Sequence, residues 1–573
     1  MINSDFRILK NKRRTVQVIL KDGRVIQGLR SAPIVDFFKT LPEWKNPPIV
    51  GAVINSELRE LTFPVEHDVE AELVTTSSSD GSKIYRRSLT FLLQAAFEKQ
   101  FHNKSLIIDY SIPSGGYFCE VDNGTQLTPA EITNLELLMR SMVKNDVPIE
   151  RETIPIKEAI QYFESKNQSE KIRLLKYRQK QYLVLYKLGQ HRDYHHGYMV
   201  PSTGYLDVFS LVHREDGFIL QYPRRKTPTQ LFPMPEYDKL IDIFRQYGGW
   251  LTSLGIDTVG ALNDAIVNNK IREIVLVSEA LHEQNVASIA ARIAAKGDQI
   301  KAVLISGPSS SGKTTFSKRL SIQLLTYGIS PFPLEMDNYF VDRDKTPRDE
   351  NGEYNFESFE AIDADLLEKH VQGLLNGEKV RIPHYDFVSG SRKAGDEVQL
   401  TNKQVIIIEG IHGLNPKLLS HFPSEKIYRL YVSCLTQLNL DRSNRISTTD
   451  TRLLRRIVRD ERTRGYSAQH TIQMWDSVRK GEREYIFRHQ ENADEIFNSA
   501  LVYELAAIKP LAEPLLRLIP HGSEEFLEAK RLLAFLEWFL PIDGSLIPDN
   551  SILREFVGGS MLQDFKLWEP HGK

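Results

Sequence analysis

The amino-acid sequence predicts an α/β protein whose largest domain is built on a parallel sheet, with two smaller domains before it. Residues 302–305 form a continuous apolar run, typical of a strand buried on both faces of a parallel sheet, and an amphipathic run begins at residue 316. Residues 15–20 alternate between apolar and polar side chains, as in a half-buried strand. The chain has 573 residues and is too long for one hydrophobic core, so it divides into domains.

A glycine loop follows the apolar run. Residues 307–314, GPSSSGKT, match the P-loop pattern G-x-x-x-x-G-K-[ST] at every position. The glycines let backbone N–H groups point at phosphate oxygens, Lys313 reaches the terminal phosphates, and the Thr314 hydroxyl holds Mg²⁺. The alternative, a chance glycine turn, is disfavoured because a strand precedes the loop and a helix follows it. The predicted nucleotide-binding residues are Gly307, Ser309, Ser310, Ser311, Gly312, Lys313, Thr314 and Thr315.

Composition and charge are those of an ordinary globular protein. The 73 Lys and Arg residues balance 75 Asp and Glu residues, so nucleic-acid binding is not favoured, although a local basic patch stays open. Two distant cysteines, Cys119 and Cys434, fit a reducing compartment. The sequence has no N-terminal apolar segment and no apolar run near the ~20 residues that span a bilayer. We expect a cytoplasmic protein without a membrane partner; its oligomeric state is unknown.

The first domain is predicted at residues 1–75. Residues 15–20 and 25–26 flank a Lys-Asp-Gly-Arg turn and indicate a hairpin, and residues 48–53 and 58–65 add short strands. This pattern indicates a small β-grasp-like domain. The segment resembles a TGS domain, the ubiquitin-like module at the front of threonyl-tRNA synthetases.

Residues 76–225 resemble the α+β editing domain of the same synthetases. Residues 69–73, at the end of the first domain, lead into this match, whose segments are a helix at 87–96, residues 148–151, a helix at 156–164, and residues 196–204. The family builds its editing site from H-x-x-x-H and C-x-x-x-H, positions that read Arg87, Phe91, His195 and Met199 here. A guanidinium, a phenyl ring and a thioether cannot replace imidazoles in acid–base chemistry. We therefore predict that the editing fold is kept and the hydrolysis is lost.

Residues 226–298 are predicted to be a linker and a helical connector. Residues 224–235 are basic and proline-rich, and apolar residues at helical spacing continue to residue 295. Just before the linker, residues 191–196 contain three histidines. Adjacent histidines in a turn do not place ligands on one face, so we predict no metal there and keep a metal tract as the alternative.

Two acidic residues are predicted at the carboxyl edge of the parallel sheet, where ligands of open α/β sheets bind. Residues 331–336 form a second strand that leads to Asp337, and residues 405–408 form a third that leads to Glu409. A carboxylate at Asp337 can accept the proton of a hydroxyl that attacks a γ-phosphorus. Glu409 has the Walker B position and can orient the Mg²⁺ shell with Thr314.

An arginine-dense helix is predicted next. Arg452, Arg455, Arg456 and Arg459 are three or four residues apart and share one helix face, and Arg462 and Arg464 follow them. Such cations repel one another unless an anion lies between them. A solvated charged face is one interpretation, and we favour a mobile lid that brings cations over migrating phosphoryl charge.

These segments resemble the uridine kinase and phosphoribulokinase family. GPSSSGKTT, MDNYF, NFESFEA, IPHYDFVSGSR, IIIEGIHGL and RRIVRDERTRG follow one another as in that family, over about residues 300–510. The resemblance implies a P-loop kinase domain, placed at residues 299–510, that uses ATP and Mg²⁺ and a small-molecule phosphate acceptor. It implies catalytic roles for Asp337, Lys313, Arg459 and Arg464, and a metal role for Thr314 and Glu409. The residues that it implies for acceptor binding are Tyr339, Glu357, Tyr385, Arg392 and Arg456.

Two departures from the family concern the acceptor. Gly390 stands where uridine kinases have a pyrimidine-reading histidine, and Met474 stands where they have a glutamine. Neither side chain can make a directed hydrogen bond to uracil, so the resemblance does not carry pyrimidine specificity with it. A C-terminal helical extension is predicted at residues 511–573, with a helix at 526–539 whose aromatic residues serve either a core or a dimer face.

The sequence thus predicts an ATP-dependent kinase that phosphorylates a hydroxyl of a nucleoside, uridine- or cytidine-like, or of a related small molecule. One alternative is a sugar or sugar-phosphate kinase of the phosphoribulokinase branch. Another is an RNA-associated regulatory NTP-binding protein whose synthetase-like front half does the recognition.

Overall fold

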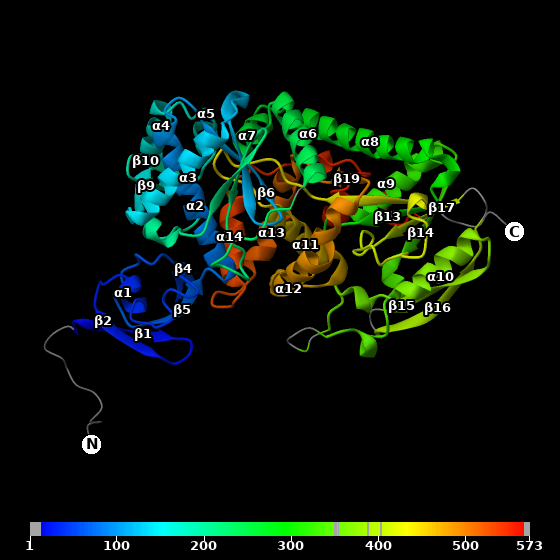
Figure 1. Cartoon of the computed structure of the whole chain (residues 1–573), viewed down its shortest axis with the longest axis horizontal. Coiled ribbons are helices and arrows are strands. Elements are labelled where there is room, and N and C mark those ends of the chain that lie inside the picture. The colour runs from blue at the N-terminus through cyan, green and yellow to red at the C-terminus, as the bar shows by residue number, and fades with distance from the viewer. Residues whose placement is uncertain are drawn as a thin grey trace, which may run out of the picture. The chain divides into compact units, whose positions relative to one another are not determined.

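The computed structural model describes residues 13–235, 237–348, 352, 354–386, 389–400 and 404–565, and its elements are labelled in Figure 1. The chain forms two compact units. Unit 1 contains residues 1–235 together with the short segments 440–445 and 520–531, and unit 2 contains the remainder. None of the helices in the described ranges has the length and apolar character that crossing a bilayer requires. The five-domain division of the sequence stays a prediction.

The front of unit 1 is a five-stranded sheet in the order β2-β1-β5-β3-β4. Its strands and the short helix packed on it are β1 (Thr15–Leu20), β2 (Val25–Leu29), α1 (Ile34–Phe38), β3 (Ile49–Ile54), β4 (Glu57–Arg59) and β5 (Val69–Thr75). β1 pairs in parallel with β5 and antiparallel with β2. The inward residues of β1, Val16 and Val18, are buried as their alternation predicts.

The predicted strand at 58–65 is wrong beyond Arg59, where β4 ends. The carbonyls of Leu61 and Phe63 accept hydrogen bonds from the start of α1, at 3.0 and 2.8 Å, and Pro64 has no N–H to give to a ladder. The segment therefore covers the start of a helix instead of extending the sheet.

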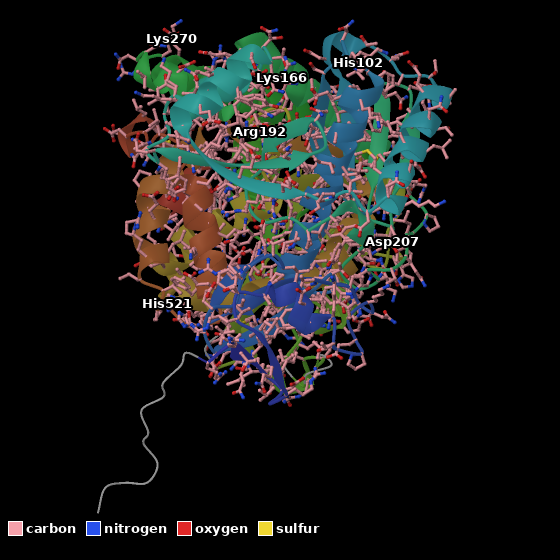
Figure 2. The ribbon with its side chains drawn as sticks, turned by 90° about the vertical axis from the view of Figure 1, so that its left-hand side faces the viewer. His102, Lys166, Arg192, Asp207, Lys270 and His521 are labelled. Atoms are coloured by element: carbon pink, nitrogen blue, oxygen red, sulfur yellow. The ribbon has the colours of Figure 1, made fainter. Side chains whose placement is uncertain are left out.

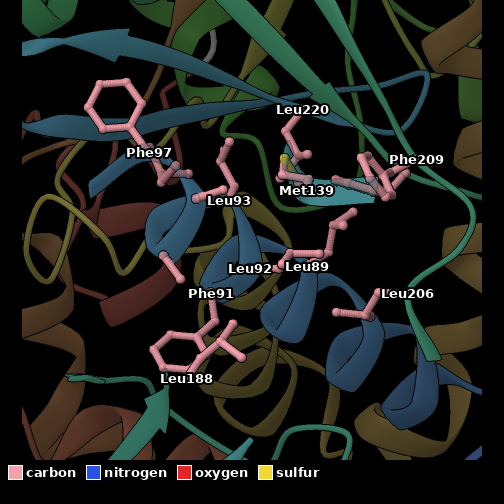
Figure 3. Close-up of a cluster of buried hydrophobic side chains, with 14 of the residues drawn as sticks. Leu89, Phe91, Leu92, Leu93, Phe97, Met139, Leu188, Leu206, Phe209 and Leu220 are labelled. Carbon is pink, nitrogen blue, oxygen red and sulfur yellow. The ribbon is translucent and has the colours of Figure 1, made fainter. Parts of the chain in front are cut away.

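The rest of unit 1 is organised around α2 (Ser79–Gln100). Ser78 caps this helix by accepting a hydrogen bond from the Gly81 N–H at 3.1 Å. Figure 3 shows Leu89, Leu92 and Leu93 of α2 among the buried side chains of this core. Two sheets, β10-β9-β8 and β11-β12-β7-β6, accompany it. The remaining elements are β6 (Leu106–Ile112), β7 (Gly116–Val121), α3 (Pro129–Lys144), β8 (Glu150–Pro155), α4 (Ile156–Ser165), α5 (Ser169–Leu175), β9 (Tyr182–Leu188), β10 (His191–Tyr194), β11 (Ser210–Arg214) and β12 (Gly217–Gln221).

Two of the cations labelled in Figure 2, Lys166 and Arg192, belong to this part of the chain. Lys166 pairs with Glu98 at 2.9 Å, and Arg192 pairs with Glu152 at 2.6 Å. The basic side chains of this surface are thus partly matched by acids, as the balanced composition suggests.

Unit 2 contains a five-stranded parallel sheet in the order β14-β17-β13-β18-β19. Its strands are β13 (Ala302–Ser306), β14 (Ser330–Glu335), β17 (Gln404–Glu409), β18 (Ile427–Ser433) and β19 (Glu495–Asn498), and Figure 1 shows β13, β14 and β17 as neighbours. Every residue of β13 is buried, as expected for a central strand covered on both faces. The predicted α/β class with a parallel P-loop sheet is confirmed.

Helices and one antiparallel hairpin complete unit 2. The hairpin joins β15 (Val380–Asp386) to β16 (Ser391–Val398). The predicted connector contains three helices, and the three aromatic residues assigned to a core or a dimer face, Phe535, Trp538 and Phe539, are all buried within the chain. The helices are α6 (Asp238–Leu254), α7 (Val259–Val267), α8 (Ile271–Ala295), α9 (Lys313–Thr326), α10 (Ala364–Leu375), α11 (Thr448–Arg464), α12 (Ala468–Gly481), α13 (Glu504–Arg517) and α15 (Arg554–Val557). The helix α14 (Phe526–Leu536) begins in the segment of unit 1 and ends in unit 2.

Candidate active site

The glycine loop turns between β13 and α9 where only small residues fit. A Cβ on Gly307 would lie 2.0 Å from the Val432 carbonyl oxygen, so the loop can approach β18 only without a side chain there. Ser310 and Gly312 have φ values of 58° and 85°, in the left-handed region. This backbone places the N-terminus of α9, a 14-residue helix, at the end of the loop. The loop thus has the tight turn and the following helix that the motif predicts, and its anion-binding role stays a prediction.

Thr314 and Glu409 meet beside this cradle. β13 and β17 are parallel neighbours with Ile305 opposite Glu409, which brings the carboxylate next to the start of α9. The Thr314 hydroxyl donates a hydrogen bond to Glu409 Oε2 at 3.0 Å. Lys313 Nζ lies in the loop and donates to the Pro308 carbonyl oxygen at 3.3 Å. The hydroxyl, the carboxylate and the amine predicted for the phosphate and metal site are therefore neighbours.

Three carboxyl groups surround Lys313 closely enough to influence one another. Burial raises the pKa of Glu409 to about 7, against the opposing Lys313 charge and with help from Asp337. Burial likewise raises the pKa of Glu357 to about 7, reinforced by the charge of Glu482. Asp337 follows β14 at the same sheet edge; its side chain reaches solvent, yet the surrounding protein still raises its pKa. The carboxyl groups of the site therefore lie close to one another as well as to Lys313.

The oxygen atoms of Thr314 and Glu409 suit a magnesium ion. Mg²⁺ takes oxygen ligands, commonly from one carboxylate, one hydroxyl, phosphate oxygens and water. Thr314 and Glu409 present such a pair of oxygens. The described residues contain no group of three or more His, Cys, Asp or Glu side chains that could hold a metal ion.

The arginines of α11 divide into two groups. Arg452 and Arg455 are completely buried, each against a carboxylate: Arg452 contacts Glu482, and Arg455 Nε donates to Glu504 Oε2 at 2.6 Å. Arg452 also donates to the Ser309 carbonyl oxygen at 2.8 Å. The predicted arginine face is therefore not solvated at these two positions, and the anions that separate its charges are carboxylates of the chain itself.

The second group gathers around Asp460. The guanidinium groups of Arg456, Arg459 and Arg464 lie 3.1, 2.8 and 3.5 Å from its carboxylate oxygens. Arg456 also donates to the Ser309 hydroxyl at 2.9 Å, so this group reaches the P-loop. The lid role predicted for these three arginines stays a prediction.

The residues predicted to bind the acceptor do not all face one space. Tyr339 is fully buried, and its hydroxyl lies 3.1 Å from His370 Nδ1. Tyr385 is buried and packs against Phe340 with ring centroids 5.5 Å apart. Arg392 donates to Asp363 at 2.8 Å. Two of the five predicted residues interact with the P-loop region. Glu357 lies within electrostatic reach of Lys313 and Asp337, and Arg456 donates to the Ser309 hydroxyl.

Gly390 and Met474, which replace the histidine and glutamine of uridine kinases, differ in their surroundings. Gly390 has a φ of 68°, and a Cβ there would lie 2.6 Å from Arg343 Nε. The side chain of Arg343 thus fills the space beside this glycine. Met474 on α12 is 44% exposed.

Two carboxylates that contact the P-loop were missed by sequence reasoning. Glu482 accepts a hydrogen bond from the Ser309 N–H at 3.0 Å, and Glu555 accepts from the Thr315 hydroxyl at 2.8 Å. They lie 173 and 240 residues from their partners. No local motif marks them, because acids such as Asp450 and Asp460 also lie close to the arginines in sequence.

The predicted editing positions lie in unit 1, and their lost hydrolysis stays a prediction. Phe91 packs against the His195 ring at a centroid distance of 5.4 Å, and Met199 is buried. Arg87 donates to the Tyr198 carbonyl oxygen at 2.5 Å. His195 is buried, its pKa is lowered to about 3 by desolvation, and its Nε2 donates to Gln94 at 2.7 Å. The Nε2 atom of His195 is therefore engaged with Gln94.

The comparisons with known proteins match two separate parts of the chain. Residues 302–506 match the Phosphoribulokinase / Uridine kinase family. This match supports a P-loop kinase domain of the phosphotransferase class and confirms the predicted resemblance. ATP use follows from the class, whereas the acceptor does not.

The N-terminal region is similar to threonine–tRNA ligases, as predicted. It is 29% identical over 190 residues to the enzyme of Clostridium kluyveri and 30% identical over 194 residues to that of Laribacter hongkongensis. These matches cover 33% and 34% of this chain and 30% of each ligase. The chain thus spans less than a third of the curated relatives that it matches.

Two solved structures are similar to part of the chain. A possible uridine kinase from Bacillus stearothermophilus is 21% identical, with a TM-score of 0.27, over 38% of this chain and 98% of that one. D-glycerate 3-kinase from Cryptococcus neoformans is 14% identical, with a TM-score of 0.25, over 36% and 89%.

Proposed function

We propose that the protein is an ATP- and Mg²⁺-dependent kinase that phosphorylates a hydroxyl of a nucleoside or a related small molecule. The observation that supports this most is the meeting of Lys313, Glu409 and Asp337 at the carboxyl edge of the parallel sheet, beside a complete P-loop. Thr314 and Glu409 would hold Mg²⁺, which neutralises phosphate charge when it is bound.

In this mechanism the acceptor hydroxyl oxygen bonds to the γ-phosphorus while the bond from that phosphorus to the β–γ bridging oxygen breaks, and ADP leaves. The hydroxyl proton passes to Asp337, whose raised pKa makes it a better proton acceptor than an ordinary aspartate. Lys313 and the arginines at 456, 459 and 464 would stabilise the charge that develops on the transferred group.

A second candidate is a kinase for a sugar or sugar phosphate. Gly390 and the neighbouring Arg343 favour it, because a guanidinium beside the position of a base-reading histidine suits an anionic or polyhydroxy acceptor better than uracil. A panel of nucleosides, sugars and sugar phosphates, with mass detection of the phosphorylated product, separates the two candidates.

The assignment of Asp337 is tested by Asp337→Asn with the best acceptor of that panel. Turnover should fall about 10²- to 10⁴-fold while ATP affinity changes little, because the amide keeps the shape and cannot take the proton. The exposed Asp344→Asn is the charge-matched control and should retain activity. A variant that lost ATP binding yet kept turnover at saturation would move Asp337 to the metal site and make Glu409 the candidate base.

A further inference from the structure

The end of unit 2 packs on the P-loop. Ile552 is fully buried, and its Cγ2 atom lies 2.6 Å from the position that a Cβ on Gly312 would take. Three residues later, Glu555 of α15 presents its carboxylate to the first turn of α9. Its Oε2 atom accepts hydrogen bonds from the Thr315 N–H at 3.2 Å and from the Thr315 hydroxyl at 2.8 Å.

These two donors are among those that a P-loop uses for phosphate. The first N–H groups of α9 have no partner within the helix and carry the positive end of its dipole, so they bind an anion. Here the anion on Thr315 is a carboxylate of the same chain. A phosphate and a carboxylate cannot share the same two donors, and their like charges would repel at that distance.

Several contacts hold this segment in place. The Nη2 atom of Arg462, on α11, donates to the Glu555 carbonyl oxygen at 2.9 Å. Lys318 of α9 donates to the Leu562 carbonyl oxygen at 2.6 Å. Phe556 is fully buried under the Arg455 guanidinium, 4.8 Å from its ring centroid. The carboxylate is therefore positioned by packing and is not a loose side chain that happens to touch the helix.

We propose that Glu555 is a residue of the phosphate-donor site that competes with the nucleotide, and that it must leave Thr315 before a nucleotide phosphate can take these donors. The inference rests on the proposed function, because it takes Thr315 as a phosphate ligand. It makes the apparent nucleotide affinity lower than the intrinsic one by the fraction of molecules in which Glu555 has moved away. Since Arg462 ties the segment to α11, movement of that helix changes this fraction.

Glu555→Gln in the full chain tests the proposal through nucleotide binding. The dissociation constants of ATP and ADP are measured by calorimetry with Mg²⁺ and without an acceptor. An amide is a weaker acceptor and carries no charge, so both nucleotides should bind about 10- to 100-fold more tightly. Asp549→Asn is the matched control: it removes the same charge from the same segment, its side chain is 72% exposed, and it should leave both constants unchanged.

Arg462→Ala is a second variant that loosens the segment without touching the P-loop, and it should tighten nucleotide binding in the same direction. Wild type that binds ATP, with Glu555→Gln binding it no better or more weakly, overturns the inference alone. If wild type and both variants are folded, as judged by circular dichroism, and none of them binds nucleotide, the proposed function is overturned as well. A wild type that fails to bind while Glu555→Gln binds supports a complete block.

Discussion

Replacing Arg455 by alanine tests whether the arginine helix α11 supports the fold or the chemistry. The guanidinium is completely buried, donates to Glu504 at 2.6 Å and donates to the Ser499 carbonyl oxygen at 2.8 Å. Its removal leaves a buried carboxylate with weaker partners. Breaking one side of a buried ion pair costs about 3–5 kcal/mol of unfolding free energy. We expect a loss of that size for Arg455→Ala.

The loss should also depend on pH. Burial raises the pKa of Glu504 even with Arg455 present to oppose it, and removing Arg455 removes that opposition. The folded variant then binds a proton more tightly than the unfolded chain does. Its stability therefore falls as the pH rises from the ordinary glutamate pKa through the raised one. The difference from wild type should be larger at pH 8 than at pH 5.

Thermal unfolding and hydrogen exchange of unit 2 measure this effect, because a chain of several domains does not unfold in one step. Arg464→Ala is the control on the same helix: its side chain is 48% exposed and 3.5 Å from Asp460, so its loss should cost at most about 1 kcal/mol. Turnover should fall in Arg464→Ala if the lid prediction holds. Equal stability of the two variants at both pH values would refute this account of α11.

Three further predictions follow from the two sites. Lys313→Ala should abolish phosphoryl transfer and leave the melting temperature unchanged, because removing this side chain opens no cavity in the core. Near wild-type turnover would contradict the assignment of Lys313 as a phosphate ligand. The full chain should not deacylate mischarged threonine-specific tRNA, because Phe91 and Met199 replace imidazoles, and hydrolysis above background would overturn this. Burial raises the pKa of Glu409 to about 7, so binding of Mg²⁺ with nucleotide should release more protons at pH 6 in wild type than in Glu409→Gln; calorimetry in two buffers measures the difference, and equal release would refute it.

The parts of the site that the sequence predicted are those whose chemistry lies within a few residues. Gly307 is required by a backbone approach of 2.0 Å, and Thr314 and Glu409 meet because each follows a strand of the same parallel sheet. A strand that ends in an acid places that acid at the carboxyl edge whatever the rest of the chain does. Local pattern and tertiary position coincide there.

The roles of the arginines could not be predicted in the same way. Arg452 and Arg455 share a helix face, and the spacing indicates only that an anion must lie nearby. The structure supplies that anion from Glu482 and Glu504, which are 30 and 49 residues away. A phosphate ligand and a distant carboxylate satisfy the same pattern, so sequence alone cannot separate structural from catalytic arginines.

The buried region of unit 1 around His195 shows the same limit. Ser443, which belongs to unit 1 although it lies between β18 and α11 in the sequence, accepts a hydrogen bond from Gln94 at 2.7 Å. Gln94 also donates to Asp193 at 3.2 Å, and Asp193 pairs with the buried Lys171. A fully bonded network of buried polar groups is stable only when every member has its partner. Displacing Ser443 would leave buried polar groups of this network unpaired, and no local pattern in the sequence links Ser443 to Gln94, 349 residues away.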